Sequence, residues 1–338
     1  MPRKSARSPR RTAGPTVAQG VSMTDSTTNR SRPRVGWIGT GRMGVAMAAR
    51  LADAGVDVTA WNRTIAKAEP LKEHGASVAE SLAALRDRDV VFTTVSTSSV
   101  LEQVLFGDDG LLTGDAAPGV VVDSSTVSVE SSAEVRRACA AKGVAYLAAP
   151  VSGNPKVARA GALSLVVSGP RETYDQVAHL LRSLGRSVTY VGEGDTARLV
   201  KIAHNLMLGV VTQTLAEITV LAEKGGVPRH AFLAFLNDSV MGSAFTRYKS
   251  PAFVHLDYTP TFTPPLLRKD FDLGLAAARA LDVPMPVTAL TAQLVQASVG
   301  TGRVDEDFAI LLDLQAAASG LDLKPEDVAV DDGLGDRS

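Results

Sequence analysis

The chain has 338 residues, of which 45% are apolar and 21% charged, and its formal net charge is −1. This length exceeds the size at which one hydrophobic core usually keeps growing, so two domains are expected. The near-neutral charge excludes a strong electrostatic field for nucleic acid. The single cysteine, Cys139, can form neither an internal disulfide nor a zinc site, which fits a reducing cytoplasm.

Residues 1–32 differ in composition from the rest of the chain. They hold seven Arg or Lys against one Asp and almost no large apolar side chain, so we expect a disordered basic tail. The remaining residues are acidic, with 28 basic and 35 acidic side chains. Two alternatives stay open for the tail: a translation start at Met23, or a transit peptide, although no amphipathic apolar face is present.

From Arg34 onward, short β-branched runs alternate with alanine-rich stretches, which is typical of β-α-β units around a parallel sheet. We therefore predict a Rossmann-type doubly wound parallel sheet in an N-terminal domain over 33–194. The expected strands are 34–39, 56–62, 89–96, 119–126, 144–153, 162–169 and 187–192, and the expected helices include 43–55, 64–75 and 134–143.

Strand-like runs stop near Gly192, and a helical pattern follows from about Asp195 to Gly225. An unbroken helix of that length would measure about 45 Å, enough to cross from one domain into another. The remainder reads as helices only. We therefore expect an all-helical C-terminal domain over 195–322, followed by an acidic tail over 323–338 that frays.

The first half of the long helix has almost no polar face, so we expect it to be buried on most sides. The apolar positions are Leu199, Val200, Ile202, Ala203, Leu206, Met207, Val210 and Val211. One small chain struggles to bury so much surface, which favours a homodimer or a homotetramer. We do not expect a membrane span, because Asn205, Gln213 and Glu217 interrupt the segment.

Three glycines, Gly39, Gly41 and Gly44, match the pattern G-x-G-x-x-G between an expected strand and an expected helix. In that context the first glycine makes a tight turn and the second lets the backbone approach a pyrophosphate. The third lets the helix pack closely on the strand, and the free amides of the helix meet the phosphates. The pattern therefore predicts a dinucleotide site; a glycine turn without a ligand is the alternative.

The end of the second expected strand, "WNRT", indicates which dinucleotide is used. NAD-selective sites usually carry Asp or Glu there, whereas this chain has the neutral Asn62 and the cationic Arg63, followed by Thr64. A guanidinium can pair with a 2′-phosphate in bidentate fashion, so NADP is favoured, with NAD possible. A solvated surface arginine is the alternative.

Lys201 is the strongest candidate for catalysis, since it lies in the otherwise apolar "ARLVKIAHNLML" with Asn205 one turn further on. Hydride delivery to a carbonyl carbon leaves an alkoxide that needs a proton, and an ammonium supplies both charge and proton. A structural lysine is the equal alternative. His204 is a second candidate acid, but a histidine at such a position is more often packed against its neighbours than catalytic. The other four histidines are scattered along the sequence and predict no metal site.

Together, these motifs resemble those of the β-hydroxyacid dehydrogenase family over about residues 34–318. The family includes 3-hydroxyisobutyrate dehydrogenases, tartronate semialdehyde reductases, and glyoxylate or succinic semialdehyde reductases. The segment "GWIGTGRMG" looks like its cofactor fingerprint, and "WNRT" like its NADP-type variant. The resemblance implies cofactor contacts from Gly39, Gly41, Arg42, Met43, Gly44, Asn62, Arg63, Thr64, Val95, Ser96, Thr126 and Lys269.

The resemblance also implies the rest of the site. "APVSGN" resembles a substrate-binding motif, which places Ser152, Gly153 and Asn154 at the substrate carboxylate. "KIAHN" matches the catalytic K-x-x-x-N, which makes Lys201 the general acid/base and Asn205 its companion. In "RKDFDLGLAAA", Lys269 would reach the cofactor or the substrate. The implied activity is NADP-dependent interconversion of a small β-hydroxyacid and its semialdehyde or keto form.

The sequence departs from the family pattern in the substrate loop, where Asn154 replaces the second glycine and Pro155 and Lys156 follow. This shifts the expected substrate toward a short semialdehyde or glyoxylate. Two alternatives stay open: an imine reductase-like enzyme, against which Lys201 argues, and a non-enzymatic dinucleotide-binding scaffold, against which intact Lys201, Asn205 and Ser152 argue.

Overall fold

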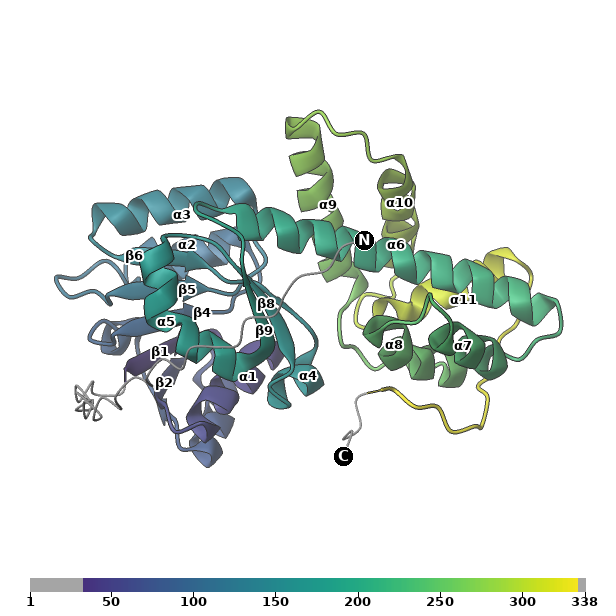
Figure 1. The fold of residues 1–338 in the computed structure, drawn as a ribbon, viewed down its shortest axis with the longest axis horizontal. Helices are drawn as coiled ribbons and strands as arrows, with labels where there is room; N and C mark the ends of the chain where they lie inside the picture. Colours follow the sequence, from purple (N-terminus) through teal and green to yellow (C-terminus); the bar gives the residue numbers. More distant parts are fainter. Residues whose placement is uncertain (1–32, 334–338) are drawn as a thin grey trace, which may run out of the picture. The chain divides into compact units, whose positions relative to one another are not determined.

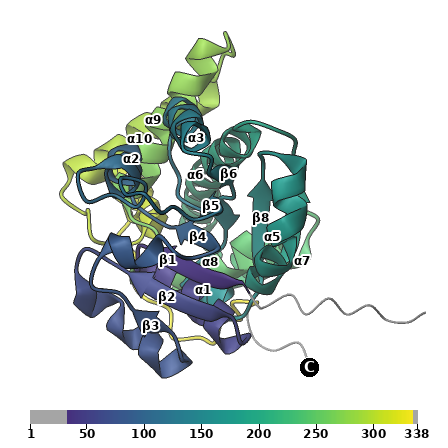
Figure 2. The ribbon, with the colours of Figure 1, turned by 90° about the vertical axis from the view of Figure 1, so that its left-hand side faces the viewer.

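A computed structural model describes residues 33–333. The basic tail predicted over 1–32, Met23 within it, and residues 334–338 lie outside the described residues. The central element is a six-stranded parallel sheet in the order β3-β2-β1-β4-β5-β6 (Figures 1 and 2). Its strands are β1 Arg34–Ile38, β2 Asp57–Trp61, β3 Ser77–Val78, β4 Val90–Thr93, β5 Val120–Asp123 and β6 Ala145–Ala148.

The strand order reverses direction beside β1, because β2 lies on one side of it and β4 on the other. In open parallel sheets, ligands bind beyond the carboxyl ends of the strands at such a switch point. The helices around this sheet are α1 Arg42–Asp53, α2 Ser98–Phe106 and α3 Val129–Ala141. Their apolar faces and the buried strands form the core, so the predicted doubly wound sheet is confirmed.

The helix expected over 64–75 is wrong in type. The segment forms two 3₁₀ turns instead, η1 Ile65–Lys67 and η2 Glu69–His74, and η3 Leu82–Leu85 follows. Pro70 lies at the start of η2 and has no amide to donate, so the two turns do not merge into one α-helix. The strand β3, which lies between η2 and η3, has only two residues and is too short to show an alternating pattern in the sequence.

The last expected strands do not all join the main sheet. The run expected over 144–153 breaks at Pro150, so that β7 Val151–Ser152 starts a second sheet with β8 Leu163–Val167 and β9 Gly185–Tyr190. In that sheet β7 is antiparallel to β8, while β8 and β9 are parallel, so the expectation of parallel strands throughout is wrong here. Two helices, α4 Pro155–Arg159 and α5 Arg171–Leu184, accompany these strands (Figure 1).

The predicted long helix is confirmed as α6 Thr196–Lys224, which runs from β8 and α3 to the C-terminal helices (Figure 1). These are α7 Arg229–Asp238, α8 Ala244–His255, α9 Pro264–Ala280, α10 Pro286–Gly300, η4 Phe308–Ile310 and α11 Leu311–Ala318. By length and composition α6 could cross a membrane, but half of its most apolar window is buried inside the protein. The boundaries of two separate domains stay a prediction.

The expectation that α6 is buried on most sides is wrong for the single chain. Ile202 and Leu206 are buried, but Leu199, Val200 and Met207 are exposed, Met207 to 68%. These exposed residues form one strip along a face of α6 that the other residues between 33 and 333 do not cover. The oligomer, which is predicted because one chain alone struggles to bury so apolar a helix, stays a prediction.

The chain end expected to fray is fastened in its described part, up to residue 333. The Glu326 carboxylate accepts hydrogen bonds from the backbone amides of Arg229, at 2.8 Å, and His230, at 3.0 Å. Arg229 is fully buried and donates to the Lys324 carbonyl. These contacts tie Lys324 and Glu326 to α7, so this part of the acidic segment packs on the helical region instead of fraying.

Candidate active site

The glycine loop after β1 has the geometry that the sequence pattern predicts. Gly39 has a φ of +93°, and a Cβ there would lie 2.2 Å from the Thr94 carbonyl oxygen. A Cβ on Gly44 would lie 1.9 Å from the Gly39 carbonyl oxygen, so helix α1 can approach β1 only because this residue is glycine. Gly41, the N-cap of α1, has no heavy atom within 4 Å of where its Cβ would be, and it faces open space.

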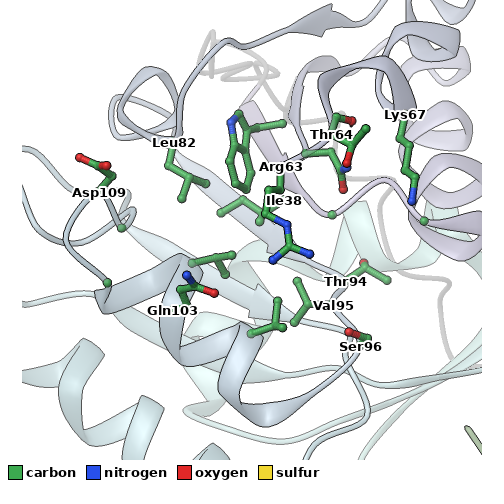
Figure 3. Close-up of a pocket in the computed structure, with 18 of the residues that line it drawn as sticks. Ile38, Arg63, Thr64, Lys67, Leu82, Thr94, Val95, Ser96, Gln103 and Asp109 are labelled. Carbon is green, nitrogen blue, oxygen red and sulfur yellow. Dashed lines mark hydrogen bonds between the residues drawn. The ribbon is translucent and has the colours of Figure 1, made fainter.

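A cavity of about 580 Å³ opens beside this loop, at the carboxyl ends of the strands (Figure 3). Asn62 connects its walls: its Oδ1 accepts from the Thr40 amide at 3.1 Å, and its Nδ2 donates to the Thr64 carbonyl at 3.0 Å. Seven of the predicted cofactor residues line this cavity, which we call the cofactor cavity. They are Gly39, Gly41, Asn62, Arg63, Thr64, Val95 and Ser96.

Two cations face the cofactor cavity. The Arg63 side chain projects into it, and Lys67, one turn further along the chain, also lines it (Figure 3). Neither side chain has a hydrogen bond or an ion pair within residues 33–333. Lys67 was missed in the sequence, although its position four residues after Arg63 was a usable signal.

A second cavity, of about 330 Å³, adjoins the first, since Gly41, Thr94, Val95 and Ser96 line both. We call it the substrate cavity. It brings together the other predicted site residues from five parts of the chain. They are Arg42, Met43, Gly44, Thr126, Ser152, Gly153, Asn154, Lys201, Asn205 and Lys269.

Lys201 and Asn205 meet on one face of α6, as their spacing predicts. Lys201 Nζ donates to Asn205 Oδ1 at 2.9 Å, and Asn205 Nδ2 donates to a carboxylate oxygen of Asp270, which is buried in α9. Burial lowers the pKa of Lys201 to about 8, while the Asp270 carboxylate opposes this shift and Lys269 adds to it. Near neutral pH this ammonium can therefore both give and regain a proton.

His204 joins α6 to the end of β7. Its Nδ1 lies 3.0 Å from Asn205 Oδ1, and its Nε2 lies 3.1 Å from Ser152 Oγ. Partial burial and the neighbouring Lys201 ammonium lower the pKa of His204 below its usual value. The Asn154 side chain does not take part in these contacts. Its Oδ1 caps the N-terminus of α4 by accepting a hydrogen bond from the Val157 amide at 3.0 Å.

Lys269 bridges α9 to the loops after β4 and β5. Its Nζ donates to the Thr126 carbonyl at 2.8 Å and lies 3.5 Å from the Ser96 carbonyl and 3.2 Å from an oxygen of Asp270. The sequence motif that pointed to Lys269 contains Asp270 as the next residue, so the signal for this carboxylate was present but not used. Asp270 thus contacts both Asn205 and Lys269, and all three residues line the substrate cavity.

A buried ion pair that the sequence analysis missed anchors the start of α6. The side chains of Arg198 and Asp123 are 1% and 0% exposed, and they are in direct contact. Arg198 Nη1 also donates to the Ser125 carbonyl at 2.6 Å, and its Nη2 to the Tyr146 hydroxyl at 2.8 Å. Since Arg198 lies one turn before Lys201, the pair fixes that lysine against the end of β5.

The two cavities fit a dinucleotide. Gly41 leaves open space at the N-terminus of α1, where backbone amides can meet phosphates. The buried Thr94 and Ser124 hydroxyls, from two residues that line the substrate cavity, have no hydrogen-bond partner within the described part of the chain. Buried polar groups are normally paired, so these hydroxyls suit a polar ligand.

Comparison with known proteins covers nearly all of the described residues. The family model of the NAD binding domain of 6-phosphogluconate dehydrogenase matches residues 34–192, and that described as NAD-binding of NADP-dependent 3-hydroxyisobutyrate dehydrogenase matches residues 192–315. The chain is 31% identical to 2-(hydroxymethyl)glutarate dehydrogenase of Eubacterium barkeri, over 85% of this chain and 96% of that protein.

Solved structures agree with these matches. A 3-hydroxyisobutyrate dehydrogenase from Salmonella typhimurium superposes with a TM-score of 0.77 at 26% identity, over 83% of this chain and 99% of that chain. A structure of Psf3 in complex with NADP+ and 2-OPP superposes with a TM-score of 0.75 at 28% identity, with the same coverage of 83% and 99%. The chain is thus an NAD(P)-dependent enzyme of hydroxyacid oxidation or reduction, and it belongs to the β-hydroxyacid dehydrogenase family.

Proposed function

We propose that the protein is an NADP-dependent oxidoreductase that interconverts a small β-hydroxyacid and its semialdehyde or keto form, with Lys201 as general acid/base. One observation carries the proposal. Lys201, Asn205, Ser152 and Lys269 line a single cavity that shares the Gly41 amide region with the cofactor cavity. A proton donor, polar groups for a carboxylate and a dinucleotide loop are thus close together.

The choice of NADP rests on the two cations of the cofactor cavity. Arg63 and Lys67 have no carboxylate partner within residues 33–333, so both charges are available to a 2′-phosphate. The glycine loop and the N-terminus of α1 hold the pyrophosphate. When bound, NADPH supplies the hydride for reduction.

Lys201 handles the proton. As the substrate carbonyl is reduced, negative charge develops on its oxygen, and the Lys201 ammonium stabilises that charge and donates its proton to the oxygen. In the reverse direction the neutral amine accepts the proton from the substrate hydroxyl. Asn205 orients Nζ through the 2.9 Å hydrogen bond, and Asp270 fixes the amide of Asn205 from the other side.

At the other end of the cavity, Ser152 and the Gly153 amide bind the substrate carboxylate, as the family motif implies. Lys269 adds positive charge nearby while it holds the loops after β4 and β5. The Asn154 side chain stabilises α4, so its contribution to substrate binding is to shape the loop.

Two further proposals concern the oligomeric state and the cellular compartment of the enzyme. The exposed strip of α6, with Leu199, Val200 and Met207, suits the packing of a second subunit, so we propose a homodimer or homotetramer. The absence of a second cysteine and the small-molecule chemistry fit the cytoplasm.

A screen for NADPH oxidation over glyoxylate, succinic semialdehyde, methylmalonate semialdehyde and tartronate semialdehyde tests the proposed function. A cyclic imine in the same panel tests the imine reductase alternative. We expect turnover with at least one semialdehyde or glyoxylate, lost in Lys201→Ala and kept in Lys142→Ala, an exposed lysine at the end of α3. NADPH binding without lysine-dependent turnover of any compound would favour the scaffold alternative.

A further inference from the structure

His204 connects the two ends of the substrate cavity, and the proposed function does not use it. Its ring touches Asn205 on α6, which holds Lys201, and Ser152 on β7, which is proposed to bind the substrate carboxylate. The donor and the acceptor of each of these hydrogen bonds are determined, because Lys201 can only donate and Asp270, the other partner of Asn205, can only accept.

The orientation of the Asn205 amide is fixed by its neighbours. The Lys201 ammonium can only donate, and the Asp270 carboxylate can only accept. Asn205 must therefore turn Oδ1 toward Lys201 and Nδ2 toward Asp270, as it does in the structure. The same Oδ1 lies 3.0 Å from Nδ1 of His204, so Nδ1 must carry a hydrogen and donate it.

The protonation state of His204 then decides what Ser152 can do. In the neutral ring with hydrogen on Nδ1, Nε2 holds a lone pair, so the Ser152 hydroxyl donates its single hydrogen to Nε2 at 3.1 Å. Ser152 then has no hydrogen left for a carboxylate. In the protonated ring, Nε2 donates to Ser152 Oγ, and the hydroxyl hydrogen is free to bind an anion.

We propose that His204 is a positioning residue that switches Ser152 into a carboxylate donor, so that binding of the substrate carboxylate takes up one proton at His204. The inference rests on the proposed function, in which Ser152 meets that carboxylate. Through this coupling, protonation of the His204 imidazole favours binding of the substrate carboxylate. Lys201 acts at the other end of the substrate, on the carbonyl or hydroxyl group.

The charges around the ring set the pH range of this coupling. Lys201 on the same helix opposes the charged ring, and burial acts in the same direction, so the pKa of His204 is lowered and the ring is largely neutral at pH 7 in the free enzyme. Lys269 and Asp270 of α9 and Tyr248 of α8 line the same cavity. A bound carboxylate favours the charged ring, which raises its pKa in the complex; proton uptake occurs between the two pKa values.

Calorimetry on the NADPH-bound enzyme measures this uptake directly. The probe is 3-hydroxyisobutyrate, which cannot react with the reduced cofactor, titrated at pH 7 in buffers of different ionisation enthalpy. The control ligand is 3-hydroxyisobutyramide, which has no charge. Lys201 interferes little, because a group with a pKa of about 8 is already about nine-tenths protonated at pH 7 and can take up only about 0.1 proton.

We expect the wild-type enzyme to take up more than about half a proton per carboxylate bound, and less than about 0.2 with the amide. His204→Gln, which cannot titrate, should bind the carboxylate without this uptake. His179→Gln, an exposed histidine of α5, should behave like the wild type. Ser152→Ala should weaken carboxylate binding and abolish the uptake.

The outcomes separate the inference from the proposed function. Carboxylate binding with equal proton uptake in the wild type and His204→Gln, or with no uptake in the wild type, overturns the inference and leaves the proposed function standing. Failure of 3-hydroxyisobutyrate, and of the hydroxyacids formed by reducing the glyoxylate and semialdehydes of the substrate panel, to bind the NADPH-bound enzyme overturns both.

Discussion

The pH at which Lys201 loses its proton can be moved in opposite directions by two single changes. The Asp270 carboxylate raises the pKa of Lys201 and the Lys269 ammonium lowers it, while burial keeps it at about 8 in the wild type. Asp270→Asn removes the favourable charge, and Lys269→Met removes the repulsive one. The two variants change one neighbouring charge each and leave Lys201 itself intact.

The size of the effect follows from how close these charges are. Asp270 is one amide side chain away from Lys201 Nζ, and a neighbouring charge at such a separation moves a pKa by about one to three, the lower end applying in an open cavity. For reduction, which needs the ammonium, activity falls as pH rises through the pKa. We expect its midpoint near pH 8 in the wild type, about one pH unit lower in Asp270→Asn and about one higher in Lys269→Met.

The assay is the pH dependence of kcat/KM for NADPH-dependent reduction between pH 6 and 10. At pH 8 the Asp270→Asn variant should lose about tenfold relative to its own low-pH plateau, against about twofold for the wild type. In the oxidation direction, which needs the neutral amine, activity should instead rise through the same midpoints. Midpoints that coincide in all three proteins, or that move in the reverse order, would refute Lys201 as the titrating acid.

Three further changes test the cofactor loop, the cofactor choice and the anchor of α6. Gly41→Ala should leave the melting temperature unchanged and weaken NADPH binding. Gly44→Ala should destabilise the fold by about 1 to 3 kcal/mol, because its Cβ would lie 1.9 Å from a backbone oxygen. Equal melting temperatures of these two variants would contradict this expectation. Arg63→Ala combined with Lys67→Ala should raise KM for NADPH at least about tenfold with little change for NADH, and equal use of both cofactors by the wild type would end that argument. Arg198→Met leaves a buried carboxylate unpaired and should cost about 3 to 5 kcal/mol in chemical denaturation, so a loss below about 1 kcal/mol would count against the anchor.

The sequence predicted those parts of the site that depend on local geometry. The glycine loop follows a strand and starts a helix, so its three positions are set by one short segment. Lys201 and Asn205 lie four residues apart on one helix, and this spacing alone brings them together. The parallel strands of the main sheet were equally visible as buried β-branched runs.

Contacts between distant segments carried no such signal. Arg198 and Asp123 are 75 residues apart, and Asn205 and Asp270 are 65 residues apart, so only the tertiary fold brings each pair together. The separate second sheet was missed because its antiparallel strand, Val151–Ser152, has only two residues. His204 was treated as a packed residue, since its contact with Ser152 depends on how α6 crosses the substrate loop.

The most direct test of the central claim is a crystal structure of the enzyme with NADPH and the hydroxyacid of its preferred substrate. The account predicts Lys201 Nζ within about 3 Å of the substrate hydroxyl oxygen, with the carboxylate at Ser152 and Gly153. A complex in which Nζ points to solvent, or in which the hydroxyl is bound by another acid, would contradict it.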